Sequence, residues 1–461
     1  MKNPLKKTTK TLKMILLINP RTSKPSEVRT QYFREPNLGL LYLAGILDLN
    51  DIPVDILDLE QFVDLNDKEL EILIKKRIIS YKIFGITSLT NTFDLALNIA
   101  RIIKSQNKDN YVIFGGPHVS FTYNDILKHD KKNESLIDFI CIGESENSFL
   151  RLVKILISNL TNKTELKKYE TQLQAINGIA FIDSKGKLFI NSTLENIKLE
   201  NLPLPARYKL SQENYYYNVA NVIVNRGCPN QCSFCSRQNL FKITRIRTIE
   251  SILREIRDIQ SLQTYNYINF YDNINISKDF FKNFCNMFIE NKLTIPWGCE
   301  IRVDTIDSEE AQLLNKAGCR LVATGIESAN ETVLKTNFKY QDPKRVRNGI
   351  INLKNNNIAI QAYFVIGLPG ETEQSFSETL EYIKTLPLDE NDELNYFVAT
   401  PYPGSRLWEE KNNFKINIIE KNFNNYDCNH IIFETNELNR EQLEILFNYA
   451  KDIERKYQRK V

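Results

Sequence analysis

The sequence predicts an α/β fold in two parts: an N-terminal doubly wound parallel sheet of the flavodoxin or Rossmann type, followed by a partial (β/α)6 barrel of the TIM type. Three observations favour this fold class. Short apolar runs recur at wide intervals in both halves, helical patterns separate them, and 461 residues exceed one ordinary domain. The expected divisions are a basic tail at 1–13, a domain at 14–150, a linker region at 151–219, a barrel at 220–404 and a C-terminal helical segment at 405–461.

Five apolar runs define the predicted N-terminal sheet. They read MILLIN, VDILDL, IFGITS, YVIFGG and FICIGE, and continuous apolar runs of this length are typical of buried parallel strands. Residues 39–49 and 95–104 place apolar side chains at helical spacing between them. The repeated βαβ pattern predicts that a ligand would bind beyond the carboxyl ends of the strands.

Six strand candidates define the predicted barrel. They read ANVIVNRG, YINFYDN, WGCEIR, LVATGIES, AYFVIGLPG and LNYFVATPYPG, with amphipathic helical segments such as residues 278–292 and 343–355 between them. Six βα units form an incomplete barrel, whose chemistry should lie at the carboxyl ends of its strands. The amphipathic helix expected at residues 440–455 could act as a lid or cover the open edge of the barrel.

Composition excludes several classes of protein. With 60 basic and 57 acidic residues the net charge is only +3, so we expect no nucleic-acid partner. No window approaches the ~18 uninterrupted apolar residues of a membrane span, and the run Met14 to Ile18 is too short for a signal peptide. Eight sparse cysteines without an export signal favour a cytoplasmic location.

Three of the cysteines lie together in a loop that follows the first predicted barrel strand. Cys228, Cys232 and Cys235 are soft ligands suited to an iron-sulfur cluster or to zinc. A structural zinc site would need a fourth cysteine or histidine nearby, and none lies within thirty residues on either side. The spacing therefore favours a cluster with three protein ligands and one open iron, with a zinc knuckle as the alternative.

The pattern C-x-x-x-C-x-x-C, with the aromatic Phe234 before the last cysteine, resembles the radical S-adenosylmethionine (SAM) superfamily. The resemblance implies a [4Fe-4S] cluster whose open iron binds SAM, and whose electron cleaves SAM to a 5′-deoxyadenosyl radical. It extends over the later strand ends, although Asn273 stands where related sequences often have a second aspartate.

SAM needs polar groups for its hydroxyl and carboxylate groups and glycine where backbone must approach its adenine. Strand ends in the barrel offer such groups, although each alone could be an ordinary loop residue. The predicted SAM-binding residues are Phe234, Asp272, Arg302, Glu327, Ser328 and Gly367.

Three motifs of the N-terminal half resemble the cobalamin-binding domain found in one radical SAM subgroup: residues 36–44, 115–118 and 143–146. A corrin ring needs a flat platform of backbone and small residues. The predicted cobalamin-binding residues are Thr87, Ser88, Thr90, Gly115, Gly116, Pro117, His118, Gly143, Glu144 and Glu146. The chain has no Asp-x-His-x-x-Gly motif, so a structural role for His118 is favoured over cobalt ligation; a domain without ligand is the alternative.

Together these resemblances imply a cobalamin-dependent radical SAM enzyme. The predicted reaction is methyl transfer to an unactivated carbon of a small molecule or secondary metabolite, with an external reductant of the flavodoxin or ferredoxin type. No catalytic side chain is assigned beyond the cluster ligands. Two alternatives stay open: a non-methylating radical SAM cyclase or rearrangement enzyme, and an iron-sulfur protein that transfers electrons or senses metal.

Overall fold

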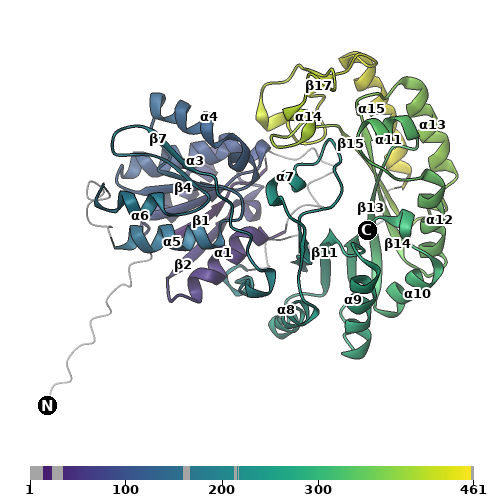
Figure 1. Ribbon diagram of the computed structural model, residues 1–461, viewed down its shortest axis with the longest axis horizontal. Coiled ribbons are helices and arrows are strands. Elements are labelled where there is room, and N and C mark those ends of the chain that lie inside the picture. Colours follow the sequence, from purple (N-terminus) through teal and green to yellow (C-terminus); the bar gives the residue numbers. More distant parts are fainter. Residues whose placement is uncertain (1–13, 23–34, 159–166, 212–214, 216–217, 458–461) are drawn as a thin grey trace. The chain divides into compact units, whose positions relative to one another are not determined.

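The computed structural model describes residues 14–22, 35–158, 167–211, 215 and 218–457. The chain divides into two compact units: Met1–Ser26, Pro36–Glu195 and Pro205–Asn214 in the first, and Glu27–Glu35, Asn196–Leu204 and Tyr215–Val461 in the second (Figure 1). The expected basic tail at 1–13 lies outside the described residues. Among the described helices, none is both long and apolar enough to cross a membrane.

The first unit is built on one seven-stranded sheet of order β2-β1-β3-β4-β5-β6-β7. The five predicted strands form its parallel part, and a hairpin adds two antiparallel strands. The strands are β1 (Ile15–Asn19), β2 (Val54–Asp58), β3 (Ile83–Thr87), β4 (Tyr111–Gly115), β5 (Phe139–Cys141), β6 (Ile179–Ile182) and β7 (Leu188–Asn191). The order β2-β1-β3-β4-β5 is that of a flavodoxin-like doubly wound sheet, as predicted.

Helices cover both faces of this sheet because alternate strand residues point to opposite sides. Ile15 and Leu17 pack with α1 (Leu38–Asp48) and α5 (Glu146–Ile157), whereas Leu16 and Ile18 belong to the core under the other helices. Those helices are α2 (Asp67–Ile78), α3 (Phe93–Gln106) and α4 (Pro117–Asn133).

The region expected to link the two domains, 151–219, carries secondary structure of its own. It contains the second half of α5, the short helix α6 (Glu170–Gln174) and the β6–β7 hairpin, which pairs with β5. Part of the expected linker therefore extends the first sheet.

The second unit contains a six-stranded parallel sheet of order β15-β14-β13-β12-β11-β8, which confirms the six predicted strands. The strands are β8 (Val219–Val222), β11 (Tyr267–Asn273), β12 (Trp297–Glu300), β13 (Cys319–Glu327), β14 (Ala359–Ile366) and β15 (Glu393–Val398). Two small antiparallel pairs accompany it: β9 (Asn225–Arg226) with β10 (Arg245–Ile246), and β16 (Asn417–Ile418) with β17 (Phe433–Glu434).

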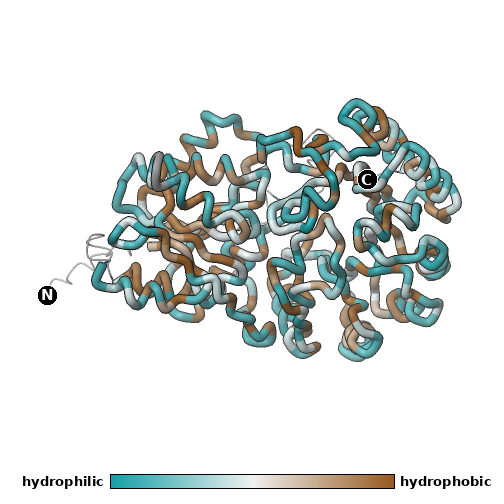
Figure 2. Tube along the Cα trace, turned by 45° about the horizontal axis from the view of Figure 1, so that its top comes forward, coloured by the Kyte–Doolittle hydropathy of each residue, from teal (hydrophilic) through white to brown (hydrophobic). Residues whose placement is uncertain are grey.

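The apolar face of the second sheet packs under a layer of helices, seen as teal and green ribbons outside the strands in Figure 1. Their bounds are α8 (Ile249–Leu262), α9 (Lys278–Glu290), α10 (Ser308–Lys316), α12 (Pro343–Lys354) and α13 (Glu373–Lys384). Phe270, Trp297 and Phe364 lie fully buried in this core. Figure 2 shows the resulting pattern, in which brown apolar stretches follow the strands while the outer turns of the helices are teal.

Helix α15 (Arg440–Glu454) covers the open edge of the second sheet. The carboxylate of Glu454 accepts a 2.8 Å hydrogen bond from the backbone N–H of Tyr396 in β15, and Lys451 Nζ donates to the carbonyl of Tyr396 over 3.1 Å. Both are side chains of α15 that satisfy backbone groups of an edge strand, which would otherwise be open to pairing with another chain. Of the two roles expected for this helix, the structure shows the edge cover.

Candidate functional site

The loop with the three cysteines connects β9 to the short helix α7 (Arg237–Phe241). Gly227 begins it with φ of 92°, in the left-handed region. A Cβ atom there would lie 2.8 Å from the carbonyl oxygen of Ile243, so a side chain would collide with the segment that leads into β10. The glycine therefore allows the chain to turn sharply into the cysteine loop.

Asp272, near the end of β11, ties the start of the loop to the sheet. Its side chain is 2 % exposed and accepts hydrogen bonds from the backbone N–H groups of Val224 at 2.7 Å and Asn225 at 3.2 Å. Its other oxygen forms an ion pair with Arg237, which also donates to the carbonyl of Gly227 over 3.1 Å. Sequence reasoning missed Arg237, although its position two residues after Cys235 was a usable signal.

The middle of the loop is anchored at Ser233. Its backbone N–H donates to the carbonyl of Asn337 over 2.9 Å, and its hydroxyl donates to the side-chain oxygen of Asn337 over 2.7 Å. Asn337 is fully buried and donates in turn to the carbonyls of Val333 and Pro369, both at 2.9 Å. The loop is thus fixed to the segments that follow β13 and β14.

The three thiols differ in exposure: Cys228 and Cys232 are half-buried, and Cys235 is exposed. Burial raises the pKa of Cys232 to about 11, against the influence of the Lys339 ammonium, so cluster binding must displace its proton. Within the described residues no three acidic, histidine or cysteine side chains are placed to hold a single metal ion. In an iron-sulfur cluster each thiolate binds a different iron, so the three sulfur atoms need not converge on one metal ion. Three thiols are a donor set that suits iron-sulfur ligation.

Arg302 connects the loop to the end of β12. It donates to the side-chain oxygen of Asn230 over 3.1 Å, and it pairs with the carboxylate of Asp304 at 2.7 Å. The side-chain nitrogen of Asn230 lies 3.5 Å from Cys228 Sγ. Arg302 therefore reaches the cysteine loop through Asn230.

Glu327 ends β13 in the left-handed region, with φ of 64°. Its carboxylate forms an ion pair with the ammonium group of Lys339, at 3.0 Å between Oε1 and Nζ, and both side chains are largely buried. Burial alone would lower the pKa of Lys339, but the charge of Glu327 outweighs this effect and raises it. Sequence reasoning missed Lys339, because it follows α11 (Glu331–Thr336) and belongs to no motif.

Ser328 and Gly367, two further predicted SAM-binding residues, make contacts within the protein. Ser328 is fully buried, its hydroxyl lies 3.2 Å from that of Thr379, and it accepts from the N–H of Asn330. Gly367 has φ of 81° and donates its N–H to Glu371. SAM contact by these residues stays a prediction.

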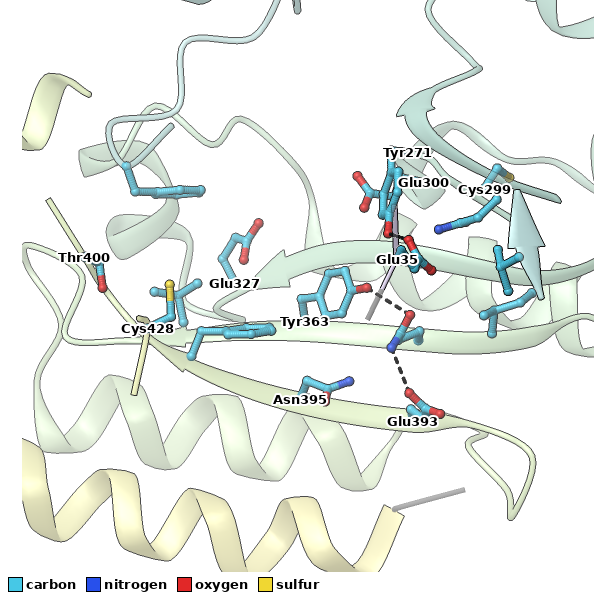
Figure 3. Close-up of a pocket in the computed structure, with 18 of the residues that line it drawn as sticks. Glu35, Tyr271, Cys299, Glu300, Glu327, Tyr363, Glu393, Asn395, Thr400 and Cys428 are labelled. Carbon is cyan, nitrogen blue, oxygen red and sulfur yellow. Dashed lines mark hydrogen bonds between the residues drawn. The ribbon is translucent and has the colours of Figure 1, made fainter. Parts of the chain in front are cut away.

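A cavity of about 1090 Å³ lies on the face of the sheet opposite the helix-covered core. Figure 3 shows Glu300, Glu327, Tyr363 and Asn395 around it. Phe234, the neighbour of Cys235, also lines it, so the cysteine loop and the cavity meet. Side chains from alternate positions form two of its walls: Gln361, Tyr363 and Val365 of β14, and Glu393, Asn395 and Phe397 of β15.

Sequence reasoning missed most of this cavity lining, although a signal was present. The barrel strands carry polar residues at every second position, as in Gln361 and Tyr363 or Glu393 and Asn395. A filled barrel would place branched apolar side chains there. Polar alternation in an otherwise buried parallel strand thus indicates a hollow interior.

In the first unit the predicted residues 87–90, 115–118 and 143 meet at the carboxyl ends of β3, β4 and β5. The N–H of Ser88 donates to the carbonyl of Gly115 over 2.9 Å, and the N–H of Gly143 donates to the hydroxyl of Ser120 over 2.9 Å. Gly116, with φ of 99°, allows close approach to Ser88, because a Cβ would lie 2.6 Å from its carbonyl oxygen.

Two observations fit this edge to a flat ligand with polar substituents. Open space faces the position where Gly115 lacks a side chain. The hydroxyl of Ser88 is buried and has no hydrogen-bond partner within the described part of the chain, so a ligand there could supply a donor or an acceptor.

The other predicted cobalamin-binding residues lie at the starts of the next two helices. Pro117 begins α4, and Glu146 begins α5 and is buried. Glu144 is half-buried between β5 and α5.

His118 is buried inside the first unit. Its exposed fraction is 2 %, its Nδ1 lies 3.2 Å from the hydroxyl of Thr90, and its ring packs on Phe93 at 4.5 Å between centroids. Burial lowers its pKa to about 4, so the ring is neutral at physiological pH. These contacts match the structural role favoured from the sequence.

Comparisons with known proteins identify a family domain in each half of the chain. Residues 28–153 match the B12 binding domain and residues 222–383 match the radical SAM superfamily. The chain is 29% identical over 406 residues to an uncharacterized methyltransferase of Pyrococcus horikoshii, with 87% of this chain and 83% of that protein covered. It is also 29% identical over 430 residues to the anaerobic magnesium-protoporphyrin IX monomethyl ester cyclase of Rubrivivax gelatinosus, with 90% and 73% covered.

A solved structure has a similar fold. The radical SAM methyltransferase TsrM from Kitasatospora setae, solved with cobalamin and a [4Fe-4S] cluster bound, superposes with a TM-score of 0.65 at 16% identity, covering 86% of this chain and 74% of that one. The two matched domains imply a [4Fe-4S] cluster, SAM and cobalamin as cofactors. The chain therefore carries a B12-binding domain followed by a radical SAM domain.

Proposed function

We propose that the protein is a cobalamin-dependent radical SAM methyltransferase that methylates an unactivated carbon of a small molecule. One observation carries the proposal: a cavity large enough for a small-molecule substrate opens beside the cysteine loop, and Phe234 belongs to both. The relatives support an enzyme of this kind, since one of them, which aligns with 87% of this chain, is named a methyltransferase.

Each part of the chain has a task in this proposal. Cys228, Cys232 and Cys235 would hold the cluster, and Phe234 and Glu327 would face SAM from the cavity wall. The ion pair of Asp272 with Arg237 keeps the loop in place beside the cavity. Arg302, Ser328 and Gly367 would shape the surrounding strand ends.

The carboxyl ends of β3, β4 and β5 would bind cobalamin. Thr87, Ser88 and Thr90 would supply hydroxyl groups, and Gly115 and Gly116 would leave the flat surface that a corrin requires. Pro117, His118, Gly143, Glu144 and Glu146 would complete the edge of this surface, with His118 supporting it from inside.

The cofactors explain why the cavity needs no acid-base apparatus. When bound, the cluster and SAM supply a radical that removes hydrogen from carbon, and cobalamin supplies the methyl group. The side chains of the cavity then bind and orient the substrate and keep water away from it. An external flavodoxin or ferredoxin would deliver the electron.

The reaction is tested with SAM that carries a CD3 group. Protein reconstituted with iron, sulfide and cobalamin under anaerobic conditions is reduced and incubated with a small-molecule extract of the source cells. We expect mass spectrometry to find a compound that gains one CD3 group. Repeated formation of 5′-deoxyadenosine without any labelled compound would favour the cyclase or rearrangement alternative, to which the relatedness to the Rubrivivax cyclase points.

A further inference from the structure

The walls of the cavity carry a row of side chains that runs across four neighbouring strands. Strand register places Glu300 of β12 beside Ala323 of β13, Ala323 beside Gln361 of β14, and Gln361 beside Glu393 of β15. Gln361 donates to the carboxylate of Glu393 over 2.8 Å. The small side chain of Ala323 leaves the middle of the row open, with a carboxylate at either end.

Carboxylates outnumber cations around this cavity. Four line it: Glu35, Glu300, Glu327 and Glu393. Among the described residues that line it, the only basic side chain is Arg320, which is exposed at the start of β13. The nearby cations Lys339 and Arg237 are already engaged by Glu327 and Asp272, so the row itself lacks positive charge.

Glu300 has no partner of its own. Within the described part of the chain nothing donates a hydrogen bond to its carboxylate, and Figure 3 shows it facing the cavity. Burial, together with the charges of Asp272 and Glu327, raises its pKa to about 7, against the influence of Arg237 and Lys339. A half-buried carboxylate without donors is costly unless a ligand supplies them.

Asn395 provides a second, independent indication of a ligand. Its side-chain nitrogen is buried and has no hydrogen-bond partner among the described residues. It lies two residues beyond Glu393 in β15, beside Tyr363, whose hydroxyl already donates to the side-chain oxygen of Gln361 over 2.9 Å. A donor without an acceptor on the wall of a polar cavity calls for an acceptor on the ligand.

We propose that the substrate is an organic cation, such as a protonated amine, whose charged nitrogen binds Glu300 and which presents a hydrogen-bond acceptor to Asn395. This inference rests on the proposed function, because it names the class of molecule that the enzyme would methylate. An ammonium group would supply the donors that Glu300 lacks, and Glu35 and Glu393 would add attraction at longer range. An anionic substrate would meet four carboxylates around the cavity and no cation in the row.

Binding of matched probes tests the charge preference. We would titrate 2-phenylethylamine, 2-phenylethanol and 3-phenylpropionate, which share a phenyl ring on a short chain and differ in charge, into holoenzyme at saturating SAM. Saturating SAM keeps the cationic probe from binding in its place. The amine should bind at least about tenfold more tightly than the alcohol, and the acid should bind most weakly.

Variants locate the effect. Glu300→Gln keeps the shape of the side chain and should abolish the preference for the amine, while Ala323→Leu should weaken all three probes by filling the row. Glu381→Gln, at an exposed position of α13, is the matched control and should bind as the wild type does. Equal or tighter binding of the acid, or an unchanged amine preference in Glu300→Gln, would overturn the proposal.

The two levels of the hypothesis fail differently. If the holoenzyme transfers CD3 from SAM to some product yet shows no preference for the amine, the substrate class is wrong and the proposed function stands. If the amine binds as expected but no labelled product forms with any extract fraction, the cavity preference stands and methyl transfer fails.

Discussion

Gly367 donates its backbone N–H to the carboxylate of Glu371 over 2.6 Å, inside the turn that follows β14. Glu371 is 2 % exposed, and burial raises its pKa from an ordinary 4.5 to about 8, in spite of this hydrogen bond. The turn thus encloses a carboxyl group that is protonated at neutral pH. This pair makes the stability of the second unit depend on pH.

Stability should fall as the pH rises from about 5 to 8. The folded state keeps the proton of Glu371 up to about pH 8, while the unfolded chain releases it near 4.5, so the stabilisation present at low pH is lost through this window. The slope contributed by one such group is roughly 1.4 kcal/mol per pH unit. Urea unfolding at several pH values should show that Glu371→Gln removes this dependence of the free energy of unfolding on pH, whereas Glu381→Gln keeps it. An equal slope in the wild type and both variants would contradict the role of Glu371.

Ser233→Ala should loosen the cysteine loop. The change leaves the buried side-chain oxygen of Asn337 without its donor, which costs about 1–3 kcal/mol. We expect a lower urea midpoint and faster loss of iron to a chelator. Ser377→Ala, which removes an exposed hydroxyl on α13, is the control, and the prediction fails if both variants lose iron at the same rate.

Lys339 and Glu327 should be strongly coupled. Lys339→Met leaves a largely buried carboxylate unpaired, and breaking such a pair costs roughly 3–5 kcal/mol. Adding Glu327→Gln should recover part of this loss, because the unpaired charge is then removed. Unfolding measurements on the two single variants and the double variant decide the matter: simple addition of the two single effects would show that the ion pair is not coupled.

His118→Gln should leave cobalt coordination unchanged. The ring of His118 is buried against Phe93 with Nδ1 toward Thr90, so it supports the domain from inside. The visible absorption bands of bound cobalamin should keep their positions. A shift of the bands in the variant would assign His118 to the metal.

The elements of the fold were predictable because their signals are local. The apolar run MILLIN became β1, and the amphipathic segment of residues 278–292 became α9. The pairing of β6 with β5 was not predictable, since the partner of a hairpin at a sheet edge depends on contacts distant in sequence. For the same reason the expected linker region contains strands of the first sheet.

The candidate site was predictable only where chemistry and spacing coincide. The three cysteines and the glycine pair at 115–116 stand in short motifs with a physical requirement behind each. Asp272 was expected at SAM, yet its oxygens are occupied by Arg237 and by two backbone groups, and its contact with SAM remains untested. Lys339 and Asn337 act through tertiary contacts across the unit, which no local pattern reveals.

The most direct test of the account is whether the reduced, cluster-loaded protein cleaves SAM to 5′-deoxyadenosine, and which cysteines this requires. Wild type and Cys319→Ala, a change in the buried core at the start of β13, should both form the nucleoside, whereas Cys235→Ala should form none. Absence of the nucleoside from wild type with a fully loaded cluster, or its persistence in Cys235→Ala, would contradict the assignment of these three cysteines to a catalytic cluster.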